Sequence, residues 1–202
     1  VPSVELTRLI GCQHRYAPDL GGWIPARNED METSVPGVFA VGDGAGVAGS
    51  AMAMFEGRIA GISTAQSLGY ISSKEARKRK KPYLSDLKKL GSLRDALDQI
   101  SYPRPGLFEL ANDDTIICRC EELTLGDIKS AIGKGTTEMN ELKRLTRMGM
   151  GRCQGRMCAP IVQEIIAGQT QTPAAEIAYL NQRPPTKPVS IKVLESLPGE
   201  FA

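Results

Sequence analysis

Aromatic residues are scarce in this 202-residue chain, at 5%, and histidine occurs only once. So few aromatic side chains cannot supply stacking platforms for bases, and a formal net charge of +2 is too small to indicate nucleic-acid binding by itself. Long hydrophobic runs are also lacking, because stretches such as 37–41 and 161–166 fall far short of the roughly 20 residues that cross a membrane. Composition therefore excludes a membrane-spanning helix and leaves the partner open.

The first residues lack an initiator Met and the basic and apolar regions of a secretory signal. We therefore expect the sequence to begin inside a longer protein. Five cysteines are present, and four of them fall in two tight clusters. Without a secretory signal, such clusters indicate metal binding rather than a disulfide framework, and they favour a reducing compartment, the cytoplasm.

Composition divides the chain into four segments. The first is rich in glycine and apolar residues, the second is charged and helical, the third carries the paired cysteines, and the last is an extended, proline-rich tail. Leucines spaced by three and four residues predict one or two amphipathic helices in the second segment, and its basic run, 77–81, is expected to be a solvated face. The predicted boundaries are 1–70, 71–110, 111–182 and 183–202.

A strand, a glycine turn and a helix are expected in succession within the first segment. Residues 37–41 form a short apolar run typical of a buried strand, 42–49 are mostly Gly and Ala, and 50–69 have the composition of a packed helix. Asp43, at the end of the strand, can accept hydrogen bonds from a polyol hydroxyl. The amides at the start of the helix favour negative charge beyond the turn.

The paired cysteines carry the second chemistry. Cys118 and Cys120 are separated by one residue, and Cys153 and Cys158 by four. Four thiolates are what two ferric ions bridged by two sulfides require, because each iron takes two cysteine ligands. A four-cysteine zinc site is the alternative, but its pairs usually enclose two to four residues, which the first pair does not. The spacing favours a [2Fe-2S] cluster.

Three helices are expected around these cysteines. Thr124 and Asp127 resemble a capping box for a helix that ends at Gly133. A second helix is predicted over 138–147 with Thr137 as its cap, and a third over 160–168. Each cysteine pair then precedes a helix, where free N–H groups stabilise anionic sulfur. Nearby arginines would offset the charge of the cluster: Arg119, Arg152 and Arg156.

Residues 117–122 and 149–158 make the region 114–170 resemble the bacterioferritin-associated-ferredoxin-like [2Fe-2S] domain. Its second cysteine pair is longer than in the stand-alone ferredoxins. That longer form is similar to the version fused to flavoprotein dehydrogenase subunits. The resemblance implies that the four cysteines are the cluster ligands.

Residues 33–43 resemble the final FAD-contacting segment of flavoproteins with two dinucleotide-binding domains. The resemblance implies that Asp43 binds the ribitol, that Gly42 packs against the diphosphate and ribitol, and that Ala51 and Met52 lie at the flavin edge. It implies an α/β fragment of such a flavoprotein, followed by a small, mostly α-helical [2Fe-2S] domain. Some similar subunits hold NAD or ATP in the equivalent cleft.

Together the two segments resemble the C-terminal part of the α-type subunit of amino-acid-oxidising complexes. These include dye-linked proline dehydrogenase, hydroxyproline dehydrogenase, opine oxidase and hydrogen cyanide synthase. The resemblance implies an electron-transfer part of a flavin- and [2Fe-2S]-dependent oxidoreductase, without substrate-oxidising residues of its own. The implied partners are a flavin subunit that oxidises the substrate and the N-terminal remainder of the flavoprotein to which this chain belongs. A non-catalytic module that docks a partner through a structural zinc or iron-sulfur site is the alternative.

The sequence lacks a Gly-x-Gly-x-x-Gly fingerprint, so most of the usual FAD contacts are absent. We therefore expect residues 1–70 to be ordered only against further protein. Three conspicuous residues are expected to have structural roles, and we assign them no function. Cys12 is expected in a small core, His14 on a surface loop, and Trp23 packed in a turn.

Overall fold

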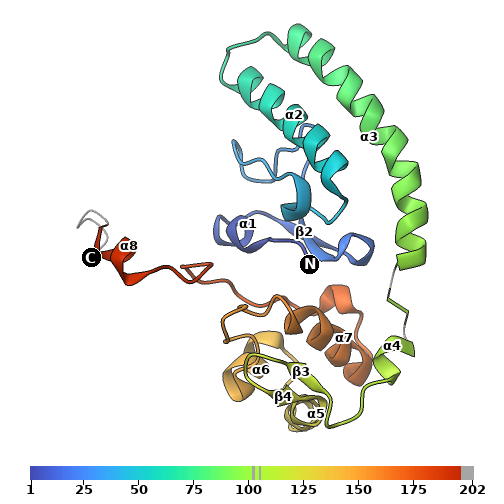
Figure 1. Ribbon diagram of the computed structural model, residues 1–202, viewed down its shortest axis with the longest axis vertical. Coiled ribbons are helices and arrows are strands. Elements are labelled where there is room, and N and C mark those ends of the chain that lie inside the picture. The colour runs from blue at the N-terminus through green and yellow to red at the C-terminus, as the bar shows by residue number, and fades with distance from the viewer. Residues whose placement is uncertain (102, 105, 197–202) are drawn as a thin grey trace.

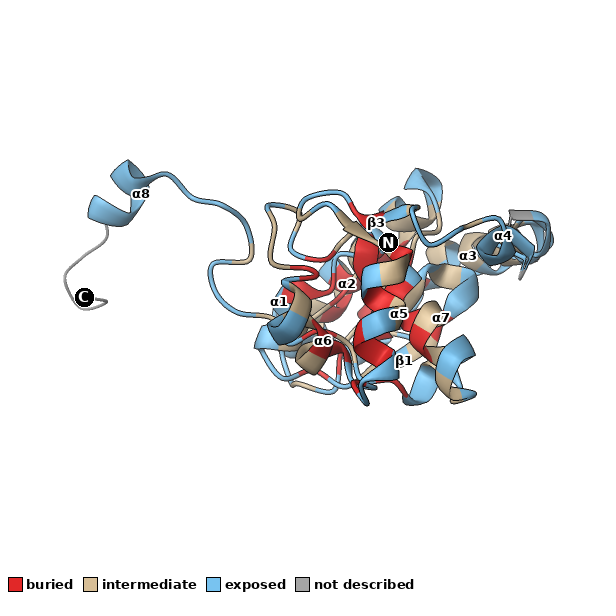
Figure 2. Cartoon of the chain, turned by 90° about the horizontal axis from the view of Figure 1, so that it is seen from below, coloured by how far each residue is buried: buried red, intermediate tan, exposed pale blue. Residues whose placement is uncertain are grey.

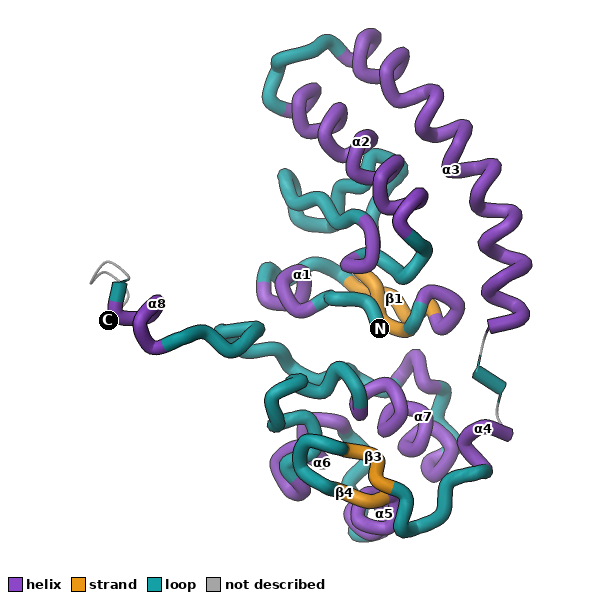
Figure 3. The backbone as a smooth tube through the Cα atoms, viewed as in Figure 1, coloured by secondary structure: helices purple, strands orange, loops and turns teal. Residues whose placement is uncertain are grey.

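The computed structural model describes residues 1–101, 103–104 and 106–196. Residues 1–101 form an N-terminal unit, residues 106–182 form a cysteine unit below it, and the tail that begins at residue 183 extends to one side (Figure 1). Helices dominate both units, and the regular strands of the described residues are confined to two short antiparallel pairs (Figure 3). No helix within those residues is long and apolar enough to cross a membrane.

The N-terminal unit begins with a short helix and a β-hairpin. In the hairpin, His14 is opposite Pro25 and Ala17 is opposite Gly22. Gly21 and Gly22 have φ values of 95° and 116°, which an L side chain adopts only under strain, so the tight reversal depends on glycine. The elements of the unit are α1 (Glu5–Leu9), β1 (His14–Ala17), η1 (Pro18–Leu20), β2 (Gly22–Pro25), η2 (Gly42–Gly44), α2 (Ser50–Ser67) and α3 (Ser73–Ser101).

The prediction of a buried strand at 37–41 is wrong. This segment is extended but makes only one isolated bridge, between Glu32 and Phe39. Its backbone pairs with the preceding turn, where Thr33 donates to Val38 at 2.8 Å. No other strand of the described chain lies beside it, so a regular ladder cannot form. The glycine turn and the helix that follow are found as predicted.

The charged segment forms one helix, α3, which packs against α2 (Figure 1). Tyr83 and Leu87 of α3 contact a small buried cluster formed by Met31, Ile59 and Ala60. The basic run on α3 is not a uniformly solvated face. Lys80 is only 7% exposed, and its Nζ donates to Asp30 Oδ1 at 2.5 Å, because the helix turns this residue toward the loop before residue 31.

The cysteine unit is a small helical domain with its own core (Figure 2). Fully buried side chains from α5, α6 and α7 meet there, among them Ile128, Leu142 and Val162. The elements of the unit are α4 (Gly106–Glu109), β3 (Ile116–Cys118), β4 (Leu123–Thr124), α5 (Leu125–Gly133), α6 (Met139–Thr146), α7 (Cys158–Thr170) and η3 (Ala174–Glu176).

Helix ends in the cysteine unit follow the sequence, with two exceptions at the starts of α6 and α7. The capping box at α5 is present, with Thr124 accepting from the Asp127 N–H and Asp127 accepting from the Thr124 N–H. The predicted Thr137 cap of α6 is wrong, because the N-cap residue is Glu138 and its side chain makes no capping bond. Helix α7 begins at Cys158 instead of Pro160, which places the last cysteine on the helix itself.

The tail extends away from both units, and its residues are mostly exposed (Figure 2). It is not extended throughout, because a short helix, α8 (Ile191–Glu195), interrupts it. Ser190 begins this helix by accepting a hydrogen bond from the Val193 N–H at 3.3 Å. The remainder of the predicted tail, residues 197–202, lies outside the described residues.

Candidate functional site

The four paired cysteines lie at four places in the cysteine unit, two in regular elements and two in the connections between elements. Cys118 ends β3, Cys120 lies in the turn before β4, Cys153 lies in the loop before α7, and Cys158 opens α7. Cys118 and Cys158 are each 1% exposed, whereas Cys120 is exposed and Cys153 is half-buried. All of them are free thiols. The site therefore reaches from the core of the unit to its surface.

The structure brings these cysteines together as two pairs. Cys118 and Cys158 are close neighbours, and so are Cys120 and Cys153, while the Cys158 thiol donates to Met148 Sδ at 3.5 Å. Burial raises the pKa of Cys158 to about 12, and the neighbouring Cys118 and Cys153 add to this shift. Among the described residues, no three Cys, His, Asp or Glu side chains are arranged as ligands of one metal ion.

The loop around Cys153 directs backbone N–H groups at its sulfur. Burial raises the pKa of Cys153, but N–H groups of Met157, Gly155 and Arg156, together with the Cys120 thiol, lower it below its ordinary value. Gln154 and Gly155 have φ values of 53° and 83°. Successive N–H groups in such a turn form a concave nest for anions, which is a feature of many iron-sulfur sites. The loop is thus suited to a thiolate.

Glycines permit the close approach of the two cysteine loops. A Cβ added to Gly151 would lie 2.1 Å from Cys120 Cβ, so no side chain fits there. A Cβ on Gly155 would lie 2.6 Å from Leu180 Cδ1, and one on Gly149 would lie 2.9 Å from the same atom. Gly149 and Gly155 also have positive φ values, so both their shape and their backbone conformation require glycine.

The predicted arginines near the cysteines differ in their exposure and in their contacts. Arg119 and Arg152 are exposed, as residues that offset charge from the surface would be. Arg156 instead reaches into the N-terminal unit and pairs with Glu5. Sequence analysis missed Arg147, whose Nε donates to Glu121 Oε2 at 2.8 Å beside the Cys120 turn. Its left-handed φ of 67° at the end of α6 turns the chain toward the cysteine loop.

The residues expected to contact a flavin lie around the start of α2. Gly42 is in the 3-10 turn η2 with a φ of 59°, and a Cβ there would lie 3.1 Å from Ala53 Cβ, so the turn sits against the first residues of α2. Asp43 and Ala51 are exposed, and Met52 is half-buried. The described chain therefore leaves the Asp43 carboxylate open to solvent and brings the turn and the helix start together.

A buried ion pair below this turn escaped the sequence analysis. Arg27 Nη2 lies 2.5 Å from Glu56 Oε1, and Arg27 Nη1 donates both to Glu56 Oε2 at 3.0 Å and to the Ala40 carbonyl at 2.7 Å. Glu56 also accepts from the Gly42 N–H at 2.7 Å. The pair ties the glycine turn to α2.

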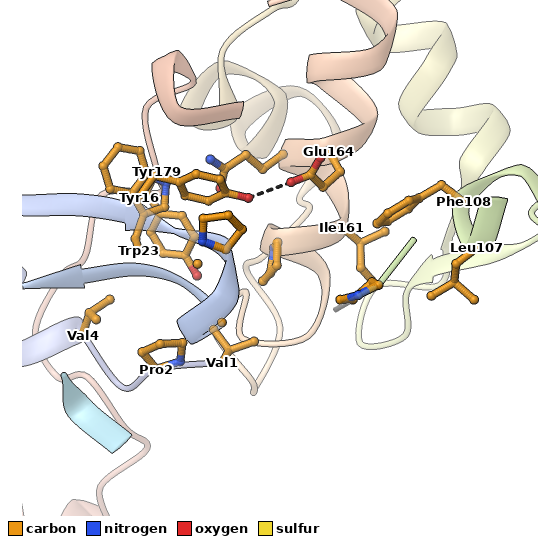
Figure 4. Close-up of a pocket in the computed structure, with 16 residues that line it drawn as sticks. Val1, Pro2, Val4, Tyr16, Trp23, Leu107, Phe108, Ile161, Glu164 and Tyr179 are labelled. Carbon is orange, nitrogen blue, oxygen red and sulfur yellow. Dashed lines mark hydrogen bonds between the residues drawn. The ribbon is translucent and has the colours of Figure 1, made fainter. Parts of the chain in front are cut away.

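A cleft of about 280 Å³ lies between the two units (Figure 4). Val4, Tyr16 and Trp23 line it from the N-terminal unit, and Ile161 and Glu164 from α7. The Tyr16 hydroxyl donates to Glu164 Oε1 at 2.6 Å across its edge (Figure 4). The two units are therefore in direct contact, and the cleft is mainly apolar.

The Arg8 guanidinium also lies at this junction, 5.4 Å from the centre of the Trp23 ring and 4.8 Å from that of Tyr179. Its Nε and Nη2, and the Trp23 Nε1, are buried without a hydrogen-bond partner among the described residues. Trp23 lies on β2 and not in the predicted turn. Contacts with both aromatic rings hold the cation between the units.

Of the residues expected to have structural roles, Cys12 lies where it was predicted and His14 does not. Cys12 is 7% exposed and hydrogen-bonds to Thr33 Oγ1 at 3.3 Å, which confirms its expected place in a small core. His14 is not on a surface loop. It lies on β1, half-buried, with its Nδ1 2.8 Å from the Cys12 carbonyl and its Nε2 2.9 Å from Thr7 Oγ1. Burial and the charge of Arg8 lower the pKa of His14.

Known proteins resemble both parts of this arrangement. Residues 113–196 match a family model described as the sarcosine oxidase A3 domain. The chain is 35% identical over 198 residues to an opine oxidase subunit of Rhizobium meliloti, covering 98% of this chain and 38% of that protein. It is 33% identical over 190 residues to hydrogen cyanide synthase subunit HcnB of Pseudomonas protegens, covering 94% and 40%. The predicted resemblance is confirmed.

A solved structure extends the likeness to the fold. The crystal structure of L-proline dehydrogenase from P. horikoshii superposes with a TM-score of 0.71, covering 96% of this chain and 37% of that one, at 23% sequence identity. At that identity the likeness concerns the fold alone. The chain spans about two fifths of the curated relatives named above, at 38% and 40% of their lengths.

Proposed function

We propose that this chain is the electron-transfer part of a flavin- and [2Fe-2S]-dependent oxidoreductase subunit that serves the oxidation of an amino or imino acid. The relatives named opine oxidase and hydrogen cyanide synthase subunits support the reaction class. The cluster ligands in this proposal are Cys118, Cys120, Cys153 and Cys158. The residues at the FAD are Gly42, Asp43, Ala51 and Met52. The partners are a flavin subunit that oxidises the substrate and the N-terminal remainder of the flavoprotein.

The observation that carries the proposal is the pairing of the cysteines around a nest of backbone N–H groups. A [2Fe-2S] cluster takes two thiolates at each of two irons, so two cysteine pairs facing one another suit it. One zinc ion would need all four sulfurs around a single point. Cys118 neighbours Cys158, and Cys120 neighbours Cys153, which supports a site with two ligand pairs. Gly151 adds support, because only glycine leaves room between Cys120 and the opposite loop.

When bound, the cluster would accept and release single electrons between a flavin and an acceptor. The residues of this chain would hold it: Cys118 and Cys158 from the core side, and Cys120 and Cys153 from the surface side. The N–H groups of 155–157 would stabilise the negative charge on the Cys153 sulfur. The exposure of Cys120 places one edge of the site at the surface, where an electron-transfer partner can approach.

The test is an anaerobic visible spectrum of the purified chain before and after dithionite, with iron, sulfide and zinc assayed on the same sample. About two irons and two sulfides per chain, with absorption that bleaches on reduction, are expected. Cys153→Ser should lower both contents, whereas Cys12→Ser should leave them unchanged, because Cys12 lies in the other unit. A colourless chain with one zinc would contradict the proposal and favour the alternative, a structural module that docks a partner.

The flavin residues are tested in the complete subunit, because the chain supplies only part of the expected site. Asp43→Ala should weaken FAD binding about tenfold or more, since a carboxylate that accepts from a hydroxyl is lost. Asp19→Ala is the matched control, because Asp19 lies on the separate turn η1. Unchanged FAD affinity in Asp43→Ala, or release of NAD or ATP from the wild-type subunit in place of FAD, would contradict the flavin assignment.

A further inference from the structure

A continuous series of hydrogen bonds leads from the glycine turn of the N-terminal unit toward the cysteine loop. The Ser3 N–H donates to the Asp43 carbonyl at 3.2 Å. The Ser3 hydroxyl donates to Glu5 Oε2 at 2.9 Å. Arg156 Nε then donates to Glu5 Oε1 at 2.5 Å. Three hydrogen bonds thus connect residue 43 with residue 156, which belongs to the other unit.

Arg156 completes the connection because its side chain contacts the N-terminal unit while its backbone belongs to the cysteine loop. Its side chain leaves the loop and pairs with Glu5, while its backbone N–H faces the Cys153 sulfur and also donates to the Cys153 carbonyl at 3.2 Å. A shift of the side chain would therefore displace an N–H group that stabilises the thiolate. The loop 153–158 and α1 lie on the facing sides of the two units (Figure 1).

Because Glu5 is buried, breaking its ion pair with Arg156 is energetically costly. Glu5 is 6% exposed, and a buried carboxylate is stable only when its oxygens are hydrogen-bonded or paired. Ser3 occupies one oxygen and Arg156 the other. Burial raises the pKa of Glu5, but its own backbone N–H, Ser3 and Arg156 lower it below the usual value, so the carboxylate stays charged. Releasing Arg156 would leave that charge buried without a cation.

We propose that Glu5 is a positioning residue for the cysteine site: through Arg156 it holds the 153–158 loop in a fixed relation to the turn at Gly42–Asp43. Its importance for electron transfer rests on the proposed function, in which Cys153 is a cluster ligand. The positioning itself is a property of the metal-free chain. A residue of the N-terminal unit thereby shapes a site built entirely in the cysteine unit.

The first experiment measures amide hydrogen exchange in the metal-free chain. In Glu5→Gln, exchange of the Arg156 and Ala159 amides should be about tenfold faster than in the wild type, because a charge-assisted hydrogen bond that restrains the loop is lost. Ser3→Ala removes a hydrogen bond from an uncharged donor to the same carboxylate but leaves the ion pair with Arg156 in place, so it should give a smaller acceleration, about threefold. This milder variant preserves the test if Glu5→Gln does not fold.

Tyr16→Phe is the matched control. It removes another hydrogen bond between the same two units, from the Tyr16 hydroxyl to Glu164, but at α7 and away from the cysteine loop. The Arg156 amide should exchange at the wild-type rate in this variant. An equal acceleration in Tyr16→Phe would show that exchange in the loop responds to any weakening of the contact between the units. Unchanged exchange in Glu5→Gln would show that the conformation of the loop does not depend on Glu5. Either result would overturn the proposal.

The second readout is loss of the cluster to an iron chelator after reconstitution with iron and sulfide. Glu5→Gln should release iron about tenfold faster than the wild type or Tyr16→Phe, and equal release rates would count against the proposal. If no variant, the wild type included, assembles a cluster, the proposed function fails. The exchange rates of the metal-free chain then still decide whether Glu5 positions the loop.

Discussion

The N-terminal unit and the cysteine unit are held together in different ways. The cysteine unit has a contiguous buried core that includes residues of β3, α5, α6 and α7. The buried apolar cluster of the N-terminal unit consists of Met31, Ile59 and Ala60, with a few partly buried neighbours. Polar ties supplement it, chiefly Arg27 with Glu56 and Lys80 with Asp30. One unit is organised around a contiguous apolar core, and the other combines smaller groups of buried apolar residues, among them Val4 and Ile24, with specific charged contacts.

This difference indicates where each unit is open to further contacts. On α3, Leu93, Leu97 and Ile100 are at least half exposed, although their spacing predicts a buried face. In the cysteine unit, apolar residues of α5, α6 and α7 such as Ile128, Leu142 and Val162 are fully buried. The sequence pattern of the N-terminal unit thus exceeds what the described chain buries. These exposed apolar side chains leave α3 open to further contacts.

The largest expected effect concerns the polar tie of the N-terminal unit. Glu56→Ala should lower the free energy of unfolding of this unit by about 3 kcal/mol or more, because Arg27 and the Gly42 N–H would lose their buried acceptor. Trp23, the only tryptophan, reports this unfolding by fluorescence in a denaturant titration of the metal-free chain. Glu75→Ala, which breaks an exposed pair with Arg79, is the control and should change little.

An effect in Glu56→Ala no larger than in Glu75→Ala would weaken the comparison. It would mean that the N-terminal unit is held by its small apolar cluster and not by its charges.

A comparable effect is expected from removing a core side chain of the cysteine unit. Leu142 is 0% exposed on α6, and Leu142→Ala should lower the free energy of unfolding of this unit by about 2–5 kcal/mol. Amide hydrogen exchange across α5–α7 measures it. The Trp23 fluorescence transition should stay near its wild-type midpoint, because Trp23 belongs to the other unit. Leu145→Ala, at an exposed position of the same helix, is the control and should change little.

If Leu142→Ala shifts both the exchange rates and the Trp23 transition equally, the two units unfold together. The comparison between them would then describe their contacts and not their stabilities.

The smallest effect concerns the junction between the units. Burial raises the pKa of Tyr179 from an ordinary 10.0 to about 12, although the charge of Arg8 opposes the shift. The folded chain therefore keeps this proton where the unfolded chain loses it. The resulting stability is present in full below about pH 10 and is lost as the pH rises through about 12. It amounts to about 3 kcal/mol at most.

Tyr179→Phe should flatten the fall in unfolding free energy between pH 10 and pH 12, as measured by denaturant titrations at each pH. Tyr70→Phe serves as the control, because Tyr70 is 79% exposed and its substitution should leave the pH dependence as in the wild type. A wild-type slope in Tyr179→Phe would show that other groups cause the alkaline loss of stability.

The order of the elements could largely be predicted from the sequence. The long charged helix, the helix after the glycine turn and the three helices of the cysteine unit all lie where periodicity and caps place them. Errors occurred where a local pattern depended on distant neighbours. Residues 37–41 have the composition of a strand but lack partners for a ladder, and Lys80 belongs to a basic run but is buried against Asp30.

The candidate site could also be predicted only in part. Spacing alone singled out the four cysteines, because their chemistry is local and unusual. It could not reveal that Gly151 faces Cys120 or that Arg156 leaves its own unit for Glu5. Glu5 and Glu56 had no distinguishing pattern, since a carboxylate on a helix is usually solvated.

By itself, the sequence determined the helices, the turns that require glycine and the two cysteine pairs that we propose as cluster ligands, because these depend on short-range backbone preferences and on side-chain chemistry. Only the tertiary structure decided which charges are buried and which loops meet, because such contacts join residues far apart in the chain. The bond between Arg156 and Glu5 spans 151 positions. No local pattern carries that information, since it arises from the packing of one unit against the other.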